Sequence, residues 1–222
     1  YVHGTPVLVT AQGTYRKMYL QSHDTELNKR WDIVIEEDGS ARASHLCPVL
    51  DFNDDGVDEL FWGERLISLK DGHQLFCGDE GLYRGHSDIV LPFVDPQTHK
   101  KYIYTCREDC EQEGQPRVIT YDENGRRVWT AVDSIGHMHN GWLANIGPEY
   151  RKVAMAMRIT RVVIDNAIRD IEPEDFYFDA VTGEALESPL PFKGSEYMPV
   201  DFNGDNRHEF YAISGESAGW VR

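Results

Sequence analysis

Residues 51–60 read DFNDDGVDEL, and residues 201–210 repeat this pattern as DFNGDNRHEF. Two weaker copies lie between them, at residues 90–107 and 142–158, each with an apolar segment on both sides of a turn. Aligned in this way, Glu59, Tyr102, Val153 and Glu209 fall in one column, with spacings of 43, 51 and 56 residues. Internal similarity at such a period is typical of repeat architectures. The chain is therefore expected to consist of copies of one structural unit.

Each copy is followed by two short β-type runs joined by a turn, and three of these turns are Asp71-Gly72, Asn124-Gly125 and Thr182-Gly183. Asp-Gly and Asn-Gly supply the positive φ angles of tight hairpins. No segment keeps a helical apolar period, and the nearest, Arg161–Asp170, suits a strand as well. Four strands per unit predict an all-β fold, a β-propeller with about four blade repeats present, in preference to a β-sandwich.

We expect a single domain over residues 1–222. The predicted repeats cover roughly residues 1–44 (partial), 45–85, 86–136, 137–193 and 194–222 (partial). Because the first and last units are incomplete, they either complete one blade of a small ring or belong to a larger ring, and we favour the larger ring.

The composition is acidic, with 22 Lys and Arg against 38 Asp and Glu and a formal charge of −16. Such a chain repels phosphate, so nucleic-acid binding is not expected. The apolar runs are far shorter than the roughly 20 residues of a membrane helix, so no membrane insertion is expected. The chain opens at Tyr1 without a signal peptide or initiator Met, which indicates a processed chain, an engineered chain or a fragment.

Four cysteines, Cys47, Cys77, Cys106 and Cys110, suit a secreted, periplasmic or cell-surface protein with two disulfides. Cys106 and Cys110 are close enough to close a loop. The alternative is four buried thiols in a cytosolic protein.

The acidic loops predict one or two structural Ca²⁺ sites. Such a loop converges several oxygen ligands on one point, and its glycine permits the sharp turn. The second loop has Asn206 where the first has Gly56, and Asn tolerates the left-handed conformation. The alternative is a self-bonded Asx turn without a metal. The candidate ligands are Asp51, Asn53, Asp55, the Val57 carbonyl and Glu59 in the first loop, and Asp201, Asn203, Asp205 and Glu209 in the second.

Histidines recur at equivalent positions. His86 and His137 each follow a glycine and are 51 residues apart (137 − 86), while His45 and His139 each precede their column residue by 14 (59 − 45; 153 − 139). In a propeller, equivalent positions of neighbouring blades converge near the axis. The four histidines are therefore expected at one mouth of the channel, where they hold a transition metal or a Ca²⁺-bridged substrate, or where one acts as a general base. The alternative for each is a hydrogen-bonded structural histidine.

Arg107 and Arg158 also align, at the ends of the second strands, where arginine can bind a carboxylate bidentately. The alternative is a surface ion pair. Tyr83 precedes His86 by three residues and is a candidate acid, and Trp142 is a candidate for stacking on a sugar ring.

The two acidic loops resemble the FG-GAP and VCBS-type repeats of integrin-like propellers. Together with Gly85-His86-Ser87-Asp88 and Val94-Asp95-Pro96, the first loop resembles the propeller polysaccharide lyases, namely the rhamnogalacturonan lyases and, more distantly, the ulvan lyases. The resemblance implies a secreted, calcium-containing enzyme of seven or eight blades that cleaves an acidic polysaccharide by β-elimination.

Elimination at a uronate needs a group that neutralises the carboxylate, a base and an acid. The candidates are Arg107, Arg158 or a cation for the first role, His86 or His137 as the base, and Tyr83 or another histidine as the acid, with His45 and Trp142 binding substrate. The second metal would lie at the histidines. The alternative function is a non-catalytic, calcium-stabilised propeller that binds a glycan or a protein, and the rest of the propeller is an expected partner if the chain is a fragment.

Overall fold

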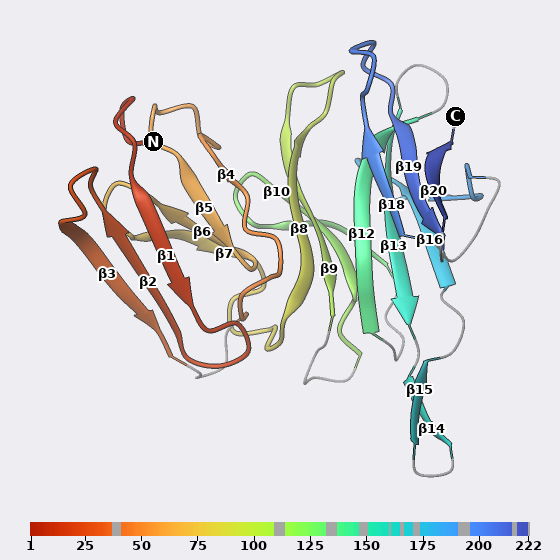
Figure 1. The fold of residues 1–222 in the computed structure, drawn as a ribbon, viewed down its shortest axis with the longest axis horizontal. Coiled ribbons are helices and arrows are strands. Elements are labelled where there is room, and N and C mark those ends of the chain that lie inside the picture. Colours follow the sequence, from red (N-terminus) through yellow and green to blue (C-terminus); the bar gives the residue numbers. More distant parts are fainter. Residues whose placement is uncertain are drawn as a thin grey trace.

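The computed structural model describes residues 1–36, 41–108, 114–131, 137–146, 151–159, 161–164, 167–170, 174–190, 196–214 and 217–221. The described chain forms antiparallel β-sheets that stand side by side in chain order along the long axis of the molecule, from β1–β3 near the N-terminus to β18–β20 near the C-terminus (Figure 1).

Three sheets have four strands each, and two have three. The first sheet contains β1 (Leu8–Gln12), β2 (Met18–His23) and β3 (Lys29–Ile35). The second contains β4 (Val49–Leu50), β5 (Glu59–Trp62), β6 (Arg65–Ser68) and β7 (Gln74–Cys77). The third contains β8 (Ser87–Val94), β9 (Lys101–Arg107), β10 (Val118–Asp122) and β11 (Arg127–Ala131). The fourth contains β12 (His137–Asn145), β13 (Lys152–Ile159), β16 (Glu174–Asp179) and β17 (Ala185–Leu186), and the last contains β18 (Glu196–Val200), β19 (Glu209–Ser214) and β20 (Ser217–Val221).

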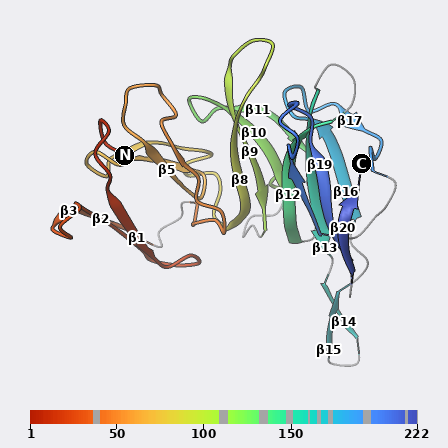
Figure 2. The same cartoon turned by 45° about the horizontal axis from the view of Figure 1, so that its top comes forward.

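A two-stranded hairpin, β14 (Arg161–Ile164) and β15 (Ala167–Asp170), interrupts the fourth sheet between β13 and β16. It projects away from the body of the molecule in both views (Figures 1 and 2). The Val-Val-Ile run that left this segment ambiguous in the sequence is therefore a strand.

The all-β prediction is confirmed, and the described residues contain no helix. Within the described residues the sheets do not close into a ring, so the propeller remains a proposal. The sheets are simple meanders in which each strand pairs with the next one along the chain, apart from the inserted hairpin. Accordingly, no helix in the described part of the chain could cross a membrane.

The hydrophobic core lies between neighbouring sheets. Tyr104 and Cys106 of β9, for example, pack in one buried cluster with Met138 of β12 and Ala154 of β13. Because both faces of an interior sheet are covered in this way, β9 and β13 are buried along almost their whole length rather than at alternate residues.

A second contact recurs between sheets. A Cβ placed on Gly72 would lie 2.7 Å from Trp31, one on Gly125 2.6 Å from Phe76, and one on Gly183 2.6 Å from Trp129. Each glycine lies in a turn with φ between 75° and 80°, and each aromatic comes from the preceding sheet. The Trp31 and Trp129 indoles also donate to the carbonyls of Leu69 and Ala180. The turn glycines thus leave room for an aromatic ring besides adopting positive φ.

Cys47, Cys77 and Cys106 are free thiols in this structure. Burial raises the pKa of Cys77 and of Cys106 to about 12. The Cys106 thiol donates a hydrogen bond to the Tyr104 hydroxyl. Cys110, its predicted partner, lies outside the described residues, so the predicted disulfides are not seen.

Candidate functional site

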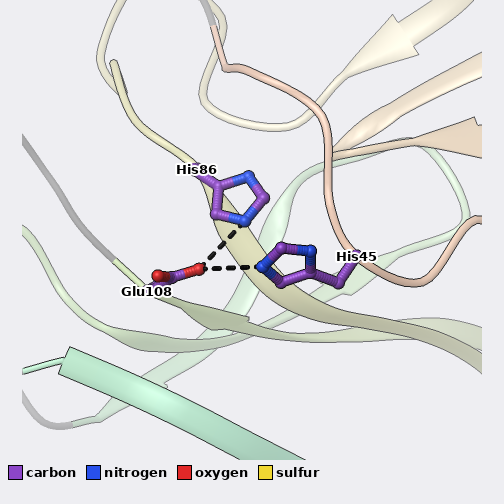
Figure 3. A group of neighbouring side chains, drawn as sticks. All are labelled: His45, His86 and Glu108. Atoms are coloured by element: carbon purple, nitrogen blue, oxygen red, sulfur yellow. Dashed lines mark ion pairs between the residues drawn. The ribbon is translucent and has the colours of Figure 1, made fainter. Parts of the chain in front are cut away.

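The candidate site is a cluster of histidines around one carboxylate, that of Glu108. The Nε2 atoms of His86 and His45 lie 3.0 and 3.3 Å from Glu108 Oε2, and His137 Nε2 lies 3.3 Å from Oε1. Figure 3 shows the His45 and His86 rings directed at the same carboxylate oxygen. His139 extends the cluster, since its Nδ1 lies 3.4 Å from His137 Nε2.

Three neighbouring sheets supply these residues. His45 lies in the segment that leads to β4, His86 immediately precedes β8, Glu108 immediately follows β9, and His137 begins β12. Strands β8 and β12 contact one another along the molecule. The structure therefore brings together the histidines that the sequence places at equivalent positions of successive repeats.

His86 is held most firmly. It is fully buried, and its Nδ1 lies 2.5 Å from the Ala43 carbonyl oxygen. A bond from Nδ1–H to this carbonyl leaves Nε2 as the ring atom that faces Glu108 and can bind a metal ion beside it. The ring of Tyr15, from the β1–β2 connection, packs 4.7 Å from the His86 ring and covers it.

Two β-bulges add side chains to the cluster. The register between β8 and β9 shifts around Asp88, and that between β12 and β13 shifts around His139. The bulged residues are 51 apart (139 − 88), so the irregularity recurs at the same place in successive sheets. A bulge re-aims the side chain of its extra residue. Here it lets Asp88 lie 3.8 Å from His45 Nε2.

Asp88 is buried beside these charges. Burial raises the pKa of its carboxyl to about 7, and the charge of Glu108 adds to this effect while that of His45 opposes it. Two imidazoles and a carboxylate within reach of one point form a donor set for a metal ion, because ligand atoms of His45, His86 and Glu108 all lie within 4.8 Å of one another.

Sequence reasoning missed Glu108, Asp88 and Tyr15. For Glu108 a signal exists: antiparallel pairing places Arg107 opposite Ser87, and extending this register by one residue brings Glu108 to His86. Asp88 and Tyr15 carry no comparable signal, since one depends on a bulge and the other on a loop from another sheet.

Several predicted site residues lie elsewhere. The Arg107 side chain is fully buried and pairs with Glu64, so it has no surface on which to bind a substrate carboxylate. Tyr83 is also fully buried, with the Arg107 guanidinium 3.6 Å from its ring centre. Arg158 lies nearer to the cluster, opposite Met138 of β12, but it pairs with Glu174 and lies over the Phe176 ring.

Trp142 is only 3% exposed and packs against Phe210 and Tyr177, so most of its ring belongs to the core rather than to a sugar-stacking surface. It does form part of a mainly apolar groove of 460 Å³ that runs over β8, β12 and β18. Leu46 and Asn140, which follow His45 and His139 in the chain, also line this groove, so it begins beside the histidine cluster.

The first acidic loop forms the turn that the sequence predicts. Its backbone N–H groups are bonded by its own side chains, with Gly56 N donating to Asp51 and Val57 N to Asp55. Glu59 is fully buried, and its Oε1 atom accepts no hydrogen bond. Burial raises the pKa of this carboxyl, and the nearby charges of Asp55 and Asp51 add to the effect. A buried, unsatisfied carboxylate oxygen among other carboxylates fits a Ca²⁺ site.

The second loop repeats this arrangement but is more exposed. Asn206 N donates to Asp201, and Asn203 Nδ2 donates to Asp205 and Glu209. Asn206 adopts the left-handed conformation with φ of 67°. Phe202 is 70% exposed, whereas its counterpart Phe52 is 4% exposed. The oxygen donors fit the same ion, in a less enclosed site.

Fold and site together define an all-β repeat domain with a histidine–carboxylate cluster across neighbouring sheets. The chain belongs to rhamnogalacturonan lyase family 11, C-terminal domain, whose family model matches residues 1–211. No curated protein sequence matches it significantly.

Two solved structures share the fold. Rhamnogalacturonan lyase YesW is 20% identical with a TM-score of 0.67, and the Bacillus licheniformis rhamnogalacturonan lyase PL11 is 21% identical with the same score. In both comparisons 92% of this chain is covered, but only 32% of the longer chain. The chain thus spans about a third of the length of these lyases.

Proposed function

We propose that this chain is part of a secreted polysaccharide lyase that cleaves an acidic, uronate-containing polysaccharide by β-elimination. The observation that carries the proposal is the convergence of three histidines on Glu108. Membership of a rhamnogalacturonan lyase family supports the reaction class and suggests a substrate in which rhamnose accompanies the uronate.

His45, His86 and Glu108 would hold a metal ion. Nitrogen and carboxylate donors together suit a transition metal better than Ca²⁺, which prefers oxygen ligands. When bound, such an ion would supply positive charge to neutralise a uronate carboxylate. The protein's own part is to present Nε2 of His86, whose ring is fixed by the Ala43 carbonyl, and to hold the Glu108 carboxylate within 3.0 Å of it.

We assign the base to His137 or His139. Their side chains are half-buried, whereas His86 is fully buried and cannot reach a polymer. Imidazole is the side chain best suited to remove a proton near neutral pH. Met138 lies between these two histidines in the chain, and Arg158 lies opposite Met138 on β13. Arg158 is therefore the arginine that we keep as a candidate for carboxylate binding.

The groove beside the cluster would receive the sugar adjacent to the reacting uronate. Its apolar lining, including Leu91 and Leu143, suits the less polar face of a sugar ring rather than a charged group. In this arrangement the charged part of the substrate contacts the histidine cluster, and the apolar part contacts the groove over β8 and β12.

The test is to replace His86, His137 and His139 singly by Ala in the full-length protein and to follow unsaturated uronate by ultraviolet absorbance. Loss of product formation by about 100-fold is expected for the base and for His86. His73→Ala, an exposed histidine paired with Asp71, is the control and is expected to retain activity. Unchanged rates in all three site variants would refute the catalytic proposal.

We further propose that the four-stranded sheets are blades of a seven- or eight-bladed propeller, completed by other parts of the protein, and that the acidic loops bind structural Ca²⁺. A second candidate function is a non-catalytic glycan-binding domain, favoured by the short span of the chain relative to the lyases. It predicts that the histidine variants lose affinity for uncleaved polysaccharide while the full-length protein keeps its cleavage rate per bound chain.

A further inference from the structure

A buried ion pair lies directly behind the histidine cluster. The side chains of Arg107 and Glu64 are 0% and 1% exposed, and they are joined by two bonds, Nε to Oε1 at 2.9 Å and Nη2 to Oε2 at 2.7 Å. Burial alone would lower the pKa of Arg107, but the charge of Glu64 outweighs burial and raises it. The guanidinium of Arg107 is therefore charged in the interior.

Asp79 extends this ion pair into a larger network. Arg107 Nη2 donates to Asp79 at 2.6 Å, and Arg127 donates to both carboxylate oxygens of Asp79. Burial would raise the pKa of Asp79, but the bonds from Arg127 and Arg107 more than offset this effect and lower it. The Tyr121 hydroxyl donates to Glu64 at 2.6 Å. The network is thus well satisfied.

Glu64 also touches the strand that carries His86. The Ser87 hydroxyl donates to Glu64 Oε1 at 2.9 Å, and Ser87 is the residue after His86. Arg107, bonded to the same carboxylate, is the residue before Glu108. The Glu108 backbone N–H donates to the His86 carbonyl at 2.9 Å. One carboxylate therefore fixes both strands, each one residue away from a member of the candidate site.

Stability alone is a weak reason for such a network. Replacing a buried ion pair by apolar residues is often neutral or stabilising, because the desolvation cost of two charges is large. What a bidentate pair supplies is directional geometry between two strands. Groups behind metal ligands orient those ligands, and their loss typically lowers metal affinity about 10- to 100-fold.

We propose that Glu64 is a positioning residue for the cluster, and that it acts through Ser87 and Arg107 to set the separation of His86 and Glu108. The inference rests on the metal site proposed above. Glu64 does not itself reach that site.

The experiment uses the full-length protein with its acidic loops saturated with Ca²⁺, and Co²⁺ as the probe for the histidine cluster. Glu64→Gln and Ser87→Ala are compared with the unsubstituted protein. Both are expected to bind Co²⁺ about 10- to 100-fold more weakly and to change its visible absorption spectrum. Arg127→Gln is the matched control, because it disturbs the far end of the network and is expected to lower the melting temperature while leaving Co²⁺ affinity unchanged.

Glu64→Gln leaves a buried arginine with one fewer anion, so it can fail to fold, and Ser87→Ala then decides the outcome because it removes a single hydroxyl. A folded Ser87→Ala protein with unaltered Co²⁺ affinity and spectrum would overturn the proposal. Nitrogen NMR of the histidine rings in metal-free protein separates a failure of the proposed metal site from a failure of the positioning role of Glu64. If the unsubstituted protein binds no Co²⁺, the metal site fails, whereas unchanged His86 and His137 ring signals in Ser87→Ala refute the positioning role independently.

Discussion

Glu108 is a single carboxylate shared by three imidazoles, and its exposure is low, at 17% of the side chain. A carboxylate in this position favours a positive charge such as a metal ion between the imidazoles. Its role is therefore electrostatic, and removing its charge while keeping its shape isolates that role.

We expect Glu108→Gln to reduce metal affinity and lyase activity about 100-fold, because the amide cannot compensate a cation or an imidazolium. Its melting temperature in the absence of metal is expected to stay close to that of the unsubstituted protein. Metal titration and the ultraviolet assay measure the effect, with Glu123→Gln in the β10–β11 turn as a control. Full activity in Glu108→Gln would show that the carboxylate has no part in the reaction.

Asp88 provides a prediction on pH. Its native pKa of about 7 lies above the ordinary value of 3.8 because of burial, with Glu108 adding to the shift and His45 opposing it. Between these values the native state keeps a proton that the unfolded state loses, so this carboxyl lowers the free energy of unfolding as pH rises from about 4 to 7. Asp88→Asn removes that contribution.

The metal-free Asp88→Asn protein is therefore expected to gain stability relative to the unsubstituted protein across this pH range and to show no further gain above it. Urea unfolding at a series of pH values measures the difference. Parallel stability curves would mean that Asp88 titrates normally.

At the scale of elements, sequence patterns predicted the strands and turns but not the bulges. Acidic loops and glycine turns are local signals, written in consecutive residues. The bulges at Asp88 and His139 depend on how two strands are registered against each other, which no local pattern of β8 or β12 encodes. For the same reason Arg107 could be placed at a strand end but not recognised as buried, since its partner Glu64 comes from another sheet.

The first acidic loop gives the element-scale prediction. Calcium is expected to raise the melting temperature of the protein, and Glu59→Gln is expected to lose most of that increase. Without calcium Glu59→Gln is expected to melt at the same or a higher temperature, because a buried carboxylate beside Asp51 and Asp55 is unfavourable when no cation is bound.

Calorimetry with and without Ca²⁺ tests whether Glu59→Gln lowers the melting temperature only when calcium is bound. Glu209→Gln is the matched variant in the second loop, where a smaller calcium effect is expected because Phe202 leaves that loop open to solvent. A melting temperature that does not respond to calcium in the unsubstituted protein would exclude a structural ion.

At the scale of the whole molecule, the sheets are joined by the recurring contact of an aromatic ring with a turn glycine. The sequence predicted these glycines for their φ angles, but the ring that each receives belongs to the preceding sheet and becomes visible only in the structure. Gly125 and Gly81 have the same φ of 75°, yet a Cβ on Gly125 would meet Phe76 while one on Gly81 would meet nothing within 4 Å.

Gly81→Ala is therefore expected to cost about 1–2 kcal/mol, the cost of a left-handed alanine. Gly125→Ala is expected to cost about 1–3 kcal/mol more, because the methyl group overpacks the interface with Phe76. Urea unfolding compares the two, and equal costs would show that the aromatic contact adjusts freely.

The aromatic–glycine contact has a consequence for cooperativity. Because it links the first four sheets in succession, their stability behaves as a sum over nearest neighbours, and disruption of one junction mainly affects the two sheets that share it. The histidine cluster draws on three consecutive sheets, so it is complete only while both intervening junctions are closed. Slow hydrogen exchange at the His86 and Glu108 amides would then report the simultaneous docking of all three sheets, and the lifetime of the assembled site would be set by the weaker junction.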